Sequence, residues 1–322
     1  MGVSINQLGV ILSLKEHIIN KNVLSLGVQF PPLKNQITIF QKKFPELLSY
    51  SELDLLLQAS FEDFQKVLFK NILGAKDIHS IDVSPAEGAD YIWNMNEDMS
   101  IYNEDRSLVK LSSSFDFIFE GGTMEHVSNI SSYLKNIFFL LKSKGLYCVN
   151  IPSNGYFEHG FFQFSPTFFA DLTIGNFPNI TLDYLCVEKG DQKIPGLAFD
   201  TWYKKTNFDF PPKLASRKSH RFYKNSFQST TLATGTLIYL LGFSFELNVM
   251  AVIQKKQNFS LNMNLIQSVY ADTSDRTMNK SDFSYKKKWP AYLKLFIRIF
   301  PLSPLIKYRL IIFILRVLGH RV

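Results

Sequence analysis

The stretch FDFIFEGGTMEHVSNISSYLKNIFFLLKSKGLYCVNIPSNGYFEHGFFQFSP, residues 115–166, carries the pattern that decides the fold. It opens with a short apolar run that ends at Glu120, and its length and composition are typical of a buried strand. Gly121 and Gly122 follow directly and permit a sharp turn, because glycine adopts left-handed dihedral angles at little cost. The beginning of the stretch therefore predicts a strand over 115–120 that ends in a tight turn.

A helix and a second strand are predicted after this turn. Apolar side chains recur at spacings of three and four over 130–141, and Ser128 or Asn129 is a suitable N-cap. Gly145, preceded by Lys142 and Lys144 in the expected last turn, predicts the helix end. The next apolar run, 146–151, predicts a strand. Two strands joined by one helix form a right-handed βαβ unit of a parallel sheet.

The rest of the chain extends this unit into a larger sheet. Apolar runs predict five further strands, at 22–26, 78–83, 89–95, 181–187 and 247–253. Helical periodicity fills much of the sequence between them, including an insertion over 29–75 after the first strand. The alternation predicts an α/β fold: a Rossmann-like, mostly parallel seven-stranded sheet with helices on both faces.

Charge is distributed unevenly along the 322 residues. The formal net charge is +7, but residues 286–322 hold nine Lys or Arg and no Asp or Glu, so the preceding residues carry −2. A nearly neutral body argues against nucleic-acid binding. From Trp289 the tail alternates bulky apolar and basic side chains, which is typical of amphipathic helices at an anionic membrane surface. Packing of these helices on the body or on a partner subunit is the alternative.

Cysteine usage and the remaining apolar segments indicate the compartment. Cys148 and Cys186 fall in predicted strands and lack the spacing of a metal or redox motif, so we predict buried, reduced thiols and no metal site. No signal peptide is evident. The uncharged stretch 225–245 contains many hydroxyl side chains, which favours a partly buried helix over a membrane span. We expect a cytoplasmic protein, peripheral at the inner membrane face where the tail binds lipid.

The ends of the predicted strands carry residues suited to a nucleoside. In open α/β sheets the ligand lies beyond the carboxyl ends of the strands. Gly27 follows the first strand, Asp82 ends the second, and Asn94 and Asn96 end the third. A carboxylate at the end of the second strand can accept both hydroxyls of a ribose, although an acid at a strand end more often caps a turn. Together with the turn at 120–122, these positions predict an adenosine-type ligand.

Several short segments carry a family pattern. Four of them, FDFI, EHV, LLKSKG and VNIP, lie within 115–152 and are similar to motifs of class I S-adenosylmethionine-dependent methyltransferases. A closer resemblance, over roughly residues 20 to 272, is to a bacterial branch of methyltransferase-like proteins. Its motifs here are DVSPAEGAD at 82–90, NMN at 94–96, EGGTMEH at 120–126, HGFFQFSP at 159–166 and QSVY at 267–270.

The resemblance implies a cofactor, S-adenosylmethionine, and a role for each matching residue. Gly27 would approach the methionine end of the cofactor and Asp82 would hold its ribose. Asn94 and Asn96 would flank the adenine, and the segment 120–123 would line the floor near the sulfonium. The implied organisation is a methyltransferase-like domain over 1–275, with a cofactor-binding core at 21–165, substrate-side elements at 166–275, and the basic tail at 276–322.

Methyl transfer requires a positioned nucleophile and often a base, and two histidines are candidates for the base. His126 and His159 fall at the predicted mouth of the site, and an ordinary imidazole pKa of about 6.5 suits a base at neutral pH. The alternatives are a backbone hydrogen bond at a helix start for His126 and a loop-fixing role for His159. Glu125 could orient His126, although adjacent residues rarely face each other on a helix.

Two functions are consistent with this sequence. The first is methyl transfer to a hydroxyl or amine of a small-molecule or glycan acceptor, loosely connected by the resemblance with surface-polysaccharide biosynthesis. The second is a catalytically silent methyltransferase fold that serves as a binding or scaffold protein at the membrane surface.

Overall fold

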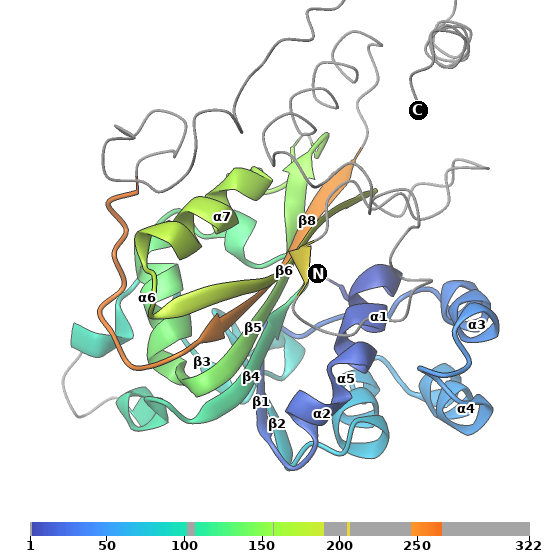
Figure 1. Ribbon diagram of the computed structural model, residues 1–322. Helices are drawn as coiled ribbons and strands as arrows, with labels where there is room; N and C mark the ends of the chain where they lie inside the picture. The colour runs from blue at the N-terminus through green and yellow to red at the C-terminus, as the bar shows by residue number, and fades with distance from the viewer. Residues whose placement is uncertain (1, 102–106, 157, 190–204, 207–245, 266–322) are drawn as a thin grey trace, which may run out of the picture. The chain divides into compact units, whose positions relative to one another are not determined.

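The computed structural model describes residues 2–101, 107–156, 158–189, 205–206 and 246–265 (Figure 1). The chain divides into two compact units, and all of these residues belong to the first, which comprises residues 1–219 and 246–271. The uncharged stretch 225–245 and the basic tail fall outside the described residues, so both interpretations stay predictions. Within the described residues, no helix has the length and apolar character needed to cross a membrane.

An eight-stranded sheet forms the centre of this unit, in the order β3-β2-β1-β4-β5-β8-β6-β7. The strands β1 to β5 are all parallel. Strand β8 lies between β5 and β6 and is antiparallel to both, and β7 is antiparallel to β6. The order of the first five strands is that of a doubly wound Rossmann-type sheet. The strands are β1 Asn22–Leu26, β2 Asp77–Asp82, β3 Tyr91–Ile92, β4 Phe115–Glu120, β5 Leu141–Asn154, β6 Ile180–Lys189, β7 Lys205–Thr206 and β8 Leu247–Lys255.

The predicted fold class is confirmed, with two differences in the strands. All seven predicted strands are present, and β7 adds a two-residue eighth strand at the edge. The third strand is also shorter than predicted, because side-chain hydrogen bonds replace part of the ladder. The carboxylate of Asp90 accepts hydrogen bonds from the backbone N–H and the hydroxyl of Ser80, at 2.7 and 3.0 Å. Only Tyr91 and Ile92 then pair with β2.

Helices cover both faces of the sheet, as predicted (Figure 1). The helices α6 and α7 lie on one face, and α1, α2 and α5 lie on the other. The insertion after β1 is helical, and it ends in a π-helical turn over 67–72. Two short helices, α1 and α2, precede β1. The bounds are α1 Ile5–Ser13, α2 Lys15–Ile18, α3 Lys34–Lys43, α4 Tyr50–Gln58, α5 Phe64–Lys66, α6 Ile130–Leu140 and α7 Pro166–Gly175.

The predicted end of the helix in the opening stretch is wrong. The helix α6 ends at residue 140, so Lys142 and Lys144 lie in β5 and not in a last helical turn. Lys142 instead donates a hydrogen bond of 2.8 Å to Asp116 on β4. The cation at the end of α6 is Lys255 from β8, whose buried Nζ donates to the carbonyl oxygens of residues 138 and 141 at 2.6 and 2.7 Å. A cation from a distant strand therefore stabilises this helix end.

The alternation of side chains along β4 determines what reaches the functional edge. Phe117 and Phe119 point to the face covered by α1 and α5, where the ring of Phe119 lies 4.6 Å from that of Phe69. Glu120 is the next residue, so its side chain turns to the opposite face and contacts Tyr147 on β5. The core continues through β5 and β6, where Cys148 and Cys186 are buried as predicted.

Candidate functional site

The structure places three of the predicted glycine and acid positions at the ends of adjacent parallel strands. Gly27 follows β1, Asp82 ends β2, and the pair Gly121-Gly122 follows β4. Gly27 has a φ of +73° and its N–H donates to the carbonyl oxygen of Ile81 at 2.8 Å. Gly122 has a φ of +102°. Both turns use backbone conformations that favour glycine, so glycine is required there for the chain to leave the sheet.

Asp82 is half-buried at the end of β2 and keeps part of its hydrogen-bonding capacity. Its Oδ1 accepts a hydrogen bond of 3.2 Å from the backbone N–H of Ser84, which is the turn-capping role considered above. Its Oδ2 makes no hydrogen bond with the described part of the chain. One carboxylate oxygen therefore stabilises the turn, and the other is available to a hydroxyl.

The two asparagines after β3 are not equivalent. Asn94 is exposed, and its Oδ1 accepts hydrogen bonds from the backbone and the side chain of Asn96, at 3.1 and 3.0 Å. The Oδ1 of Asn96 is itself bonded to the hydroxyl of Ser128 and the backbone N–H of Asn129, at 2.9 and 2.8 Å. Asn96 thus fastens the loop after β3 to the start of α6, which is a structural role beside its predicted place near the adenine.

Asn136 supports the same loop and was missed by the sequence analysis. This residue of α6 is buried; its Oδ1 accepts from the backbone N–H of Met99 at 2.8 Å and its Nδ2 donates to the carbonyl oxygen of Glu97 at 2.8 Å. An amide among the apolar residues of a helix is the signal that could have identified it. The loop 94–99 is therefore positioned by side chains of α6.

The carboxylate of Glu120 faces the interior and not the open edge. Its Oε2 accepts hydrogen bonds from the backbone N–H groups of Thr123 and Met124, at 3.1 and 2.9 Å, and its Oε1 accepts one from the hydroxyl of Tyr147. Burial raises the pKa of the Glu120 carboxyl, although these hydrogen bonds oppose the change. Glu120 consequently shapes the turn after β4 from the buried side, and its carboxylate is not available to a ligand at the edge.

The start of the chain lies over Gly121. The N–H of Gly2 donates to the carbonyl oxygen of Gly121 at 3.1 Å. A Cβ atom on Gly121 would lie 2.5 Å from the carbonyl oxygen of Gly2, 2.8 Å from Oε1 of Gln29 and 3.0 Å from Oε1 of Gln7. A side chain at this position would therefore force the neighbouring backbone or side chains to shift.

Gln7 and Gln29 place two acceptor atoms beside this glycine. The side-chain amide of Gln7 donates to the backbone carbonyl oxygen of Glu120 at 2.5 Å, and that of Gln29 donates to the carbonyl oxygen of Leu26 at 2.6 Å. Both Oε1 atoms are buried and have no hydrogen-bond partner in the described residues. Neither residue was predicted from the sequence, although a glutamine directly after the first strand and its turn was a visible signal.

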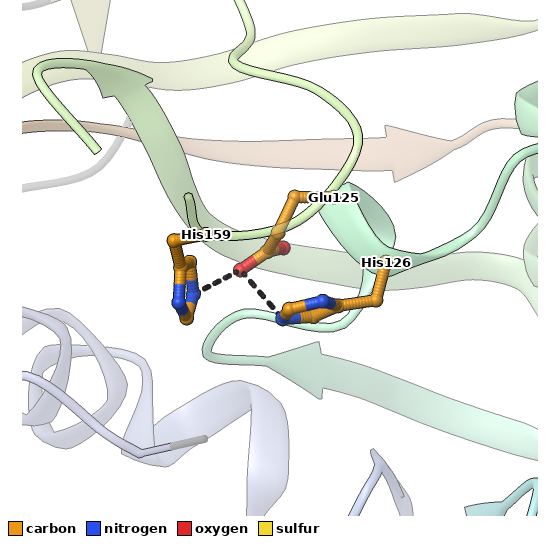
Figure 2. A group of neighbouring side chains, drawn as sticks. All are labelled: Glu125, His126 and His159. Atoms are coloured by element: carbon orange, nitrogen blue, oxygen red, sulfur yellow. Dashed lines mark ion pairs between the residues drawn. The ribbon is translucent and has the colours of Figure 1, made fainter. Parts of the chain in front are cut away.

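A second group of side chains gathers beside the turn after β4 (Figure 2). The Oε1 of Glu125 lies 3.8 Å from Nε2 of His126 and 3.5 Å from Nε2 of His159. The two imidazole rings are 4.9 Å apart in an edge-to-face arrangement. The predicted catalytic residues His126 and His159 are thus brought together, and the carboxylate between them comes from the residue that precedes His126.

Local backbone geometry explains this arrangement. Residues Met124–His126 form a single 3-10 turn, so Glu125 and His126 are not constrained to the divergent directions of neighbours on an α-helix. The carbonyl oxygen of Glu125 accepts the backbone N–H groups of Phe161 and Phe162, at 2.6 and 3.3 Å. These hydrogen bonds hold the loop after β5 against the turn and place His159 beside Glu125.

The electrostatics of the cluster are set by burial. The side chain of Glu125 is 1% exposed, whereas those of His126 and His159 are 41% and 49% exposed. Burial, followed by the charge of Glu120, raises the pKa of the Glu125 carboxyl to about 8. Burial, followed by the charge of His159, lowers the pKa of His126. The arrangement can exchange a proton with a molecule at the edge or hold a cation, although no metal site was predicted.

Comparisons with known proteins identify methyltransferases among solved structures. A scan of protein-family models and a search of curated proteins both found no match. A phosphoethanolamine N-methyltransferase from Haemonchus contortus, with S-adenosylmethionine, is 11% identical, with a TM-score of 0.35 and coverage of 78% of this chain and 52% of that one. A 1,6-didemethyltoxoflavin-N1-methyltransferase from Burkholderia thailandensis, with S-adenosylhomocysteine, is 11% identical, with a TM-score of 0.35 and coverage of 79% and 78%.

An arsenic(III) S-adenosylmethionine methyltransferase from Chlamydomonas reinhardtii is 10% identical, with a TM-score of 0.39 and coverage of 75% of this chain and 65% of that one. The chain spans only 46% and 52% of the lengths of two such structures, one from Galdieria sulphuraria and the Haemonchus protein. These similarities are too low to assign an activity to this chain.

Proposed function

We propose that this chain is an S-adenosylmethionine-dependent methyltransferase that acts on a hydroxyl or amine of a small-molecule or glycan acceptor. The observation that carries the proposal is the strand order β3-β2-β1-β4, which gathers Gly27, Asp82 and the turn 120–122 at neighbouring carboxyl ends. In sheets of this kind the ligand occupies that edge.

The chemistry of the edge residues fits such a cofactor. The carboxylate oxygen of Asp82 that makes no bond in the described residues suits a ribose hydroxyl. The buried Oε1 atoms of Gln7 and Gln29 receive no hydrogen bond from the residues that the structure describes, which suits the ammonium group of a methionine moiety. The bound cofactor would supply an electrophilic methyl group on a sulfonium. Asn94 and Asn96 stay the proposed neighbours of the adenine.

The acceptor would approach from the ends of β4 and β5. His126 and His159 flank this side and are both exposed enough to meet a solvent-borne molecule. An imidazole of this cluster would accept the proton that the acceptor oxygen or nitrogen loses on methylation. Holding the acceptor in line is worth about 7–11 kcal/mol of the barrier, and a base adds roughly 10²–10⁴-fold in rate.

Titration calorimetry with S-adenosylhomocysteine tests the cofactor site. We expect the wild-type chain to bind it and the variant Asp82→Ala to lose binding, because the ribose hydroxyls lose their acceptor. Asp54→Ala, which removes an exposed carboxylate on α4, is the matched control and should bind like the wild type. Unchanged affinity in Asp82→Ala would refute the proposed geometry.

A second candidate function, a methyltransferase fold that only binds or scaffolds, is favoured by one observation. The carbonyl oxygen of Gly2 and two glutamine side chains already crowd Gly121 at the edge where the methionine moiety would lie. The same titration separates the two functions. A well-folded wild-type chain that does not bind S-adenosylhomocysteine would favour the scaffold and contradict the enzyme.

The cellular setting is part of the proposal. Residues 286–322 of the tail hold nine cations and no acid, which supports attachment to an anionic membrane surface from the cytoplasmic side. An acceptor in surface-polysaccharide biosynthesis would be reached at that surface.

A further inference from the structure

We propose that Glu125, His126 and His159 form a binding site for one first-row divalent transition-metal ion, such as Zn²⁺. This site is separate from the proposed nucleoside-binding residues Gly27 and Asp82, because it lies beside the ends of β4 and β5 and not beside β1 and β2. Its donors are two imidazole nitrogens and one carboxylate, which is a ligand set that Zn²⁺ and Fe²⁺ take in catalytic sites.

The distances between the donor atoms are close to those that a metal requires. Zinc–nitrogen and zinc–oxygen bonds near 2.1 Å at a tetrahedral angle separate two donors by about 3.4 Å. The Glu125 oxygen lies 3.5 and 3.8 Å from the two imidazole nitrogens, and the three donor atoms lie within 4.8 Å of one another. Because both imidazoles are exposed, small side-chain rotations bring all three donors to bonding distance of one ion (Figure 2).

The carboxylate supplies independent support for a cation. Glu125 is completely buried, and neither of its oxygens has a hydrogen-bond partner among the described residues. Separations of 3.5 and 3.8 Å from the imidazoles exceed the length of a hydrogen bond. A buried carboxylate without hydrogen bonds is costly, and a coordinated metal ion would satisfy it.

The fold holds this arrangement in place before any metal binds. Gly160 adopts a φ of +72°, and a Cβ atom there would lie 2.8 Å from both Cγ and the carbonyl oxygen of Glu125. Glycine at 160 therefore allows the loop that carries His159 to lie directly on Glu125. Such close packing limits the entropy lost when the donors converge on an ion.

Three protein ligands leave at least one coordination position for a molecule from solution, as in catalytic zinc sites. A role for the metal in catalysis rests on the proposed methyl transfer. In that role, an acceptor hydroxyl would occupy the open coordination position. Coordination would then lower the pKa of this hydroxyl, since zinc lowers the pKa of a bound water to about 7. The proton would be released to solvent in place of transfer to an imidazole, because the imidazole Nε2 atoms would bind the metal.

Metal binding is tested with Co²⁺ and Zn²⁺ added to the full chain prepared in a chelator and then dialysed. Equilibrium dialysis gives the stoichiometry, and the visible absorption of Co²⁺ reports its coordination. We expect one tightly bound ion per chain, with Zn²⁺ displacing Co²⁺. Each of Glu125→Gln, His126→Ala and His159→Ala should weaken metal binding by about 100-fold or more. Loss of an outer-shell partner already weakens metal affinity by about 10–100-fold, and these residues would contact the ion directly.

The matched control is His79→Gln, because Nε2 of His79 lies 3.5 Å from a carboxylate oxygen of Asp77, outside the proposed three-ligand site. This variant should bind Co²⁺ like the wild type. Thermal unfolding confirms that each variant is folded; His126→Ala and His159→Ala change exposed side chains. Absence of a stoichiometric ion in the wild type, or wild-type affinity in all three ligand variants, would overturn the site. Since the readout is metal binding, its outcome is independent of the S-adenosylhomocysteine titration.

Discussion

The buried carboxylate of Glu120 contributes to the pH dependence of the fold's stability, and Glu120→Gln should remove that contribution. The glutamine keeps an acceptor oxygen for the N–H groups of Thr123 and Met124 and places an NH₂ group near the hydroxyl of Tyr147, which can accept. The substitution therefore conserves the shape and most hydrogen bonds, and it removes the ionisable proton.

The sign of the effect follows from the raised pKa of Glu120 in the folded state, where burial is the main cause. In the unfolded chain the carboxyl ionises near pH ~4.3. Above this pH the unfolded state loses its proton first, so the wild type loses stability until the pH passes the folded-state pKa. Over this window the free energy of unfolding of Glu120→Gln, relative to the wild type, should rise by about 1.4 kcal/mol per pH unit.

Urea unfolding of both chains at a series of pH values measures this difference. Glu52→Gln is an informative control on α4, because it should show the opposite trend. Burial alone would raise the pKa of Glu52, but hydrogen bonds from Ser49 and the charge of Lys15 lower it overall. Its contribution is therefore present above the unfolded pKa and is lost as the pH falls through the folded pKa. A pH-independent difference between Glu120→Gln and the wild type would refute the reasoning.

Three further outcomes are expected. Gly121→Ala should lower the free energy of unfolding by about 1–3 kcal/mol in urea, because its Cβ would lie 2.5 Å from the carbonyl oxygen of Gly2; wild-type stability would contradict the close approach. Lys255→Met should lower the free energy of unfolding by about 2 kcal/mol or more, because two carbonyl oxygens at the end of α6 lose their donor. Lys256→Met, at the exposed neighbouring position, should change the free energy of unfolding little. A chain ending at Ser284 should stay soluble and lose the sedimentation with anionic liposomes that the full chain is expected to show; a full chain that never sediments would exclude the anchor.

Much of the fold was predictable because strand and helix periodicity reflects local burial. The apolar runs at 22–26 and 115–120 predicted the bounds of β1 and β4, and Gly27 and Asp82 marked two strand ends correctly. The run at 146–151 predicted only the middle of β5, which spans Leu141–Asn154. Where a distant side chain intervened, the prediction was wrong. Lys255 from β8 caps α6, so that helix ends before the expected glycine at 145.

The candidate site also has a part that the sequence predicted and a part that it did not. The sequence by itself determined the α/β class, the edge at which Gly27, Asp82 and the turn after β4 meet, and the two histidines worth considering, because these depend on residue type and strand order. Only the tertiary structure decided that Glu120 faces inward and that Glu125 lies between His126 and His159. The physical reason is that these contacts depend on strand alternation and on a loop held by backbone hydrogen bonds to a 3-10 turn, and the residues joined are as many as 34 positions apart.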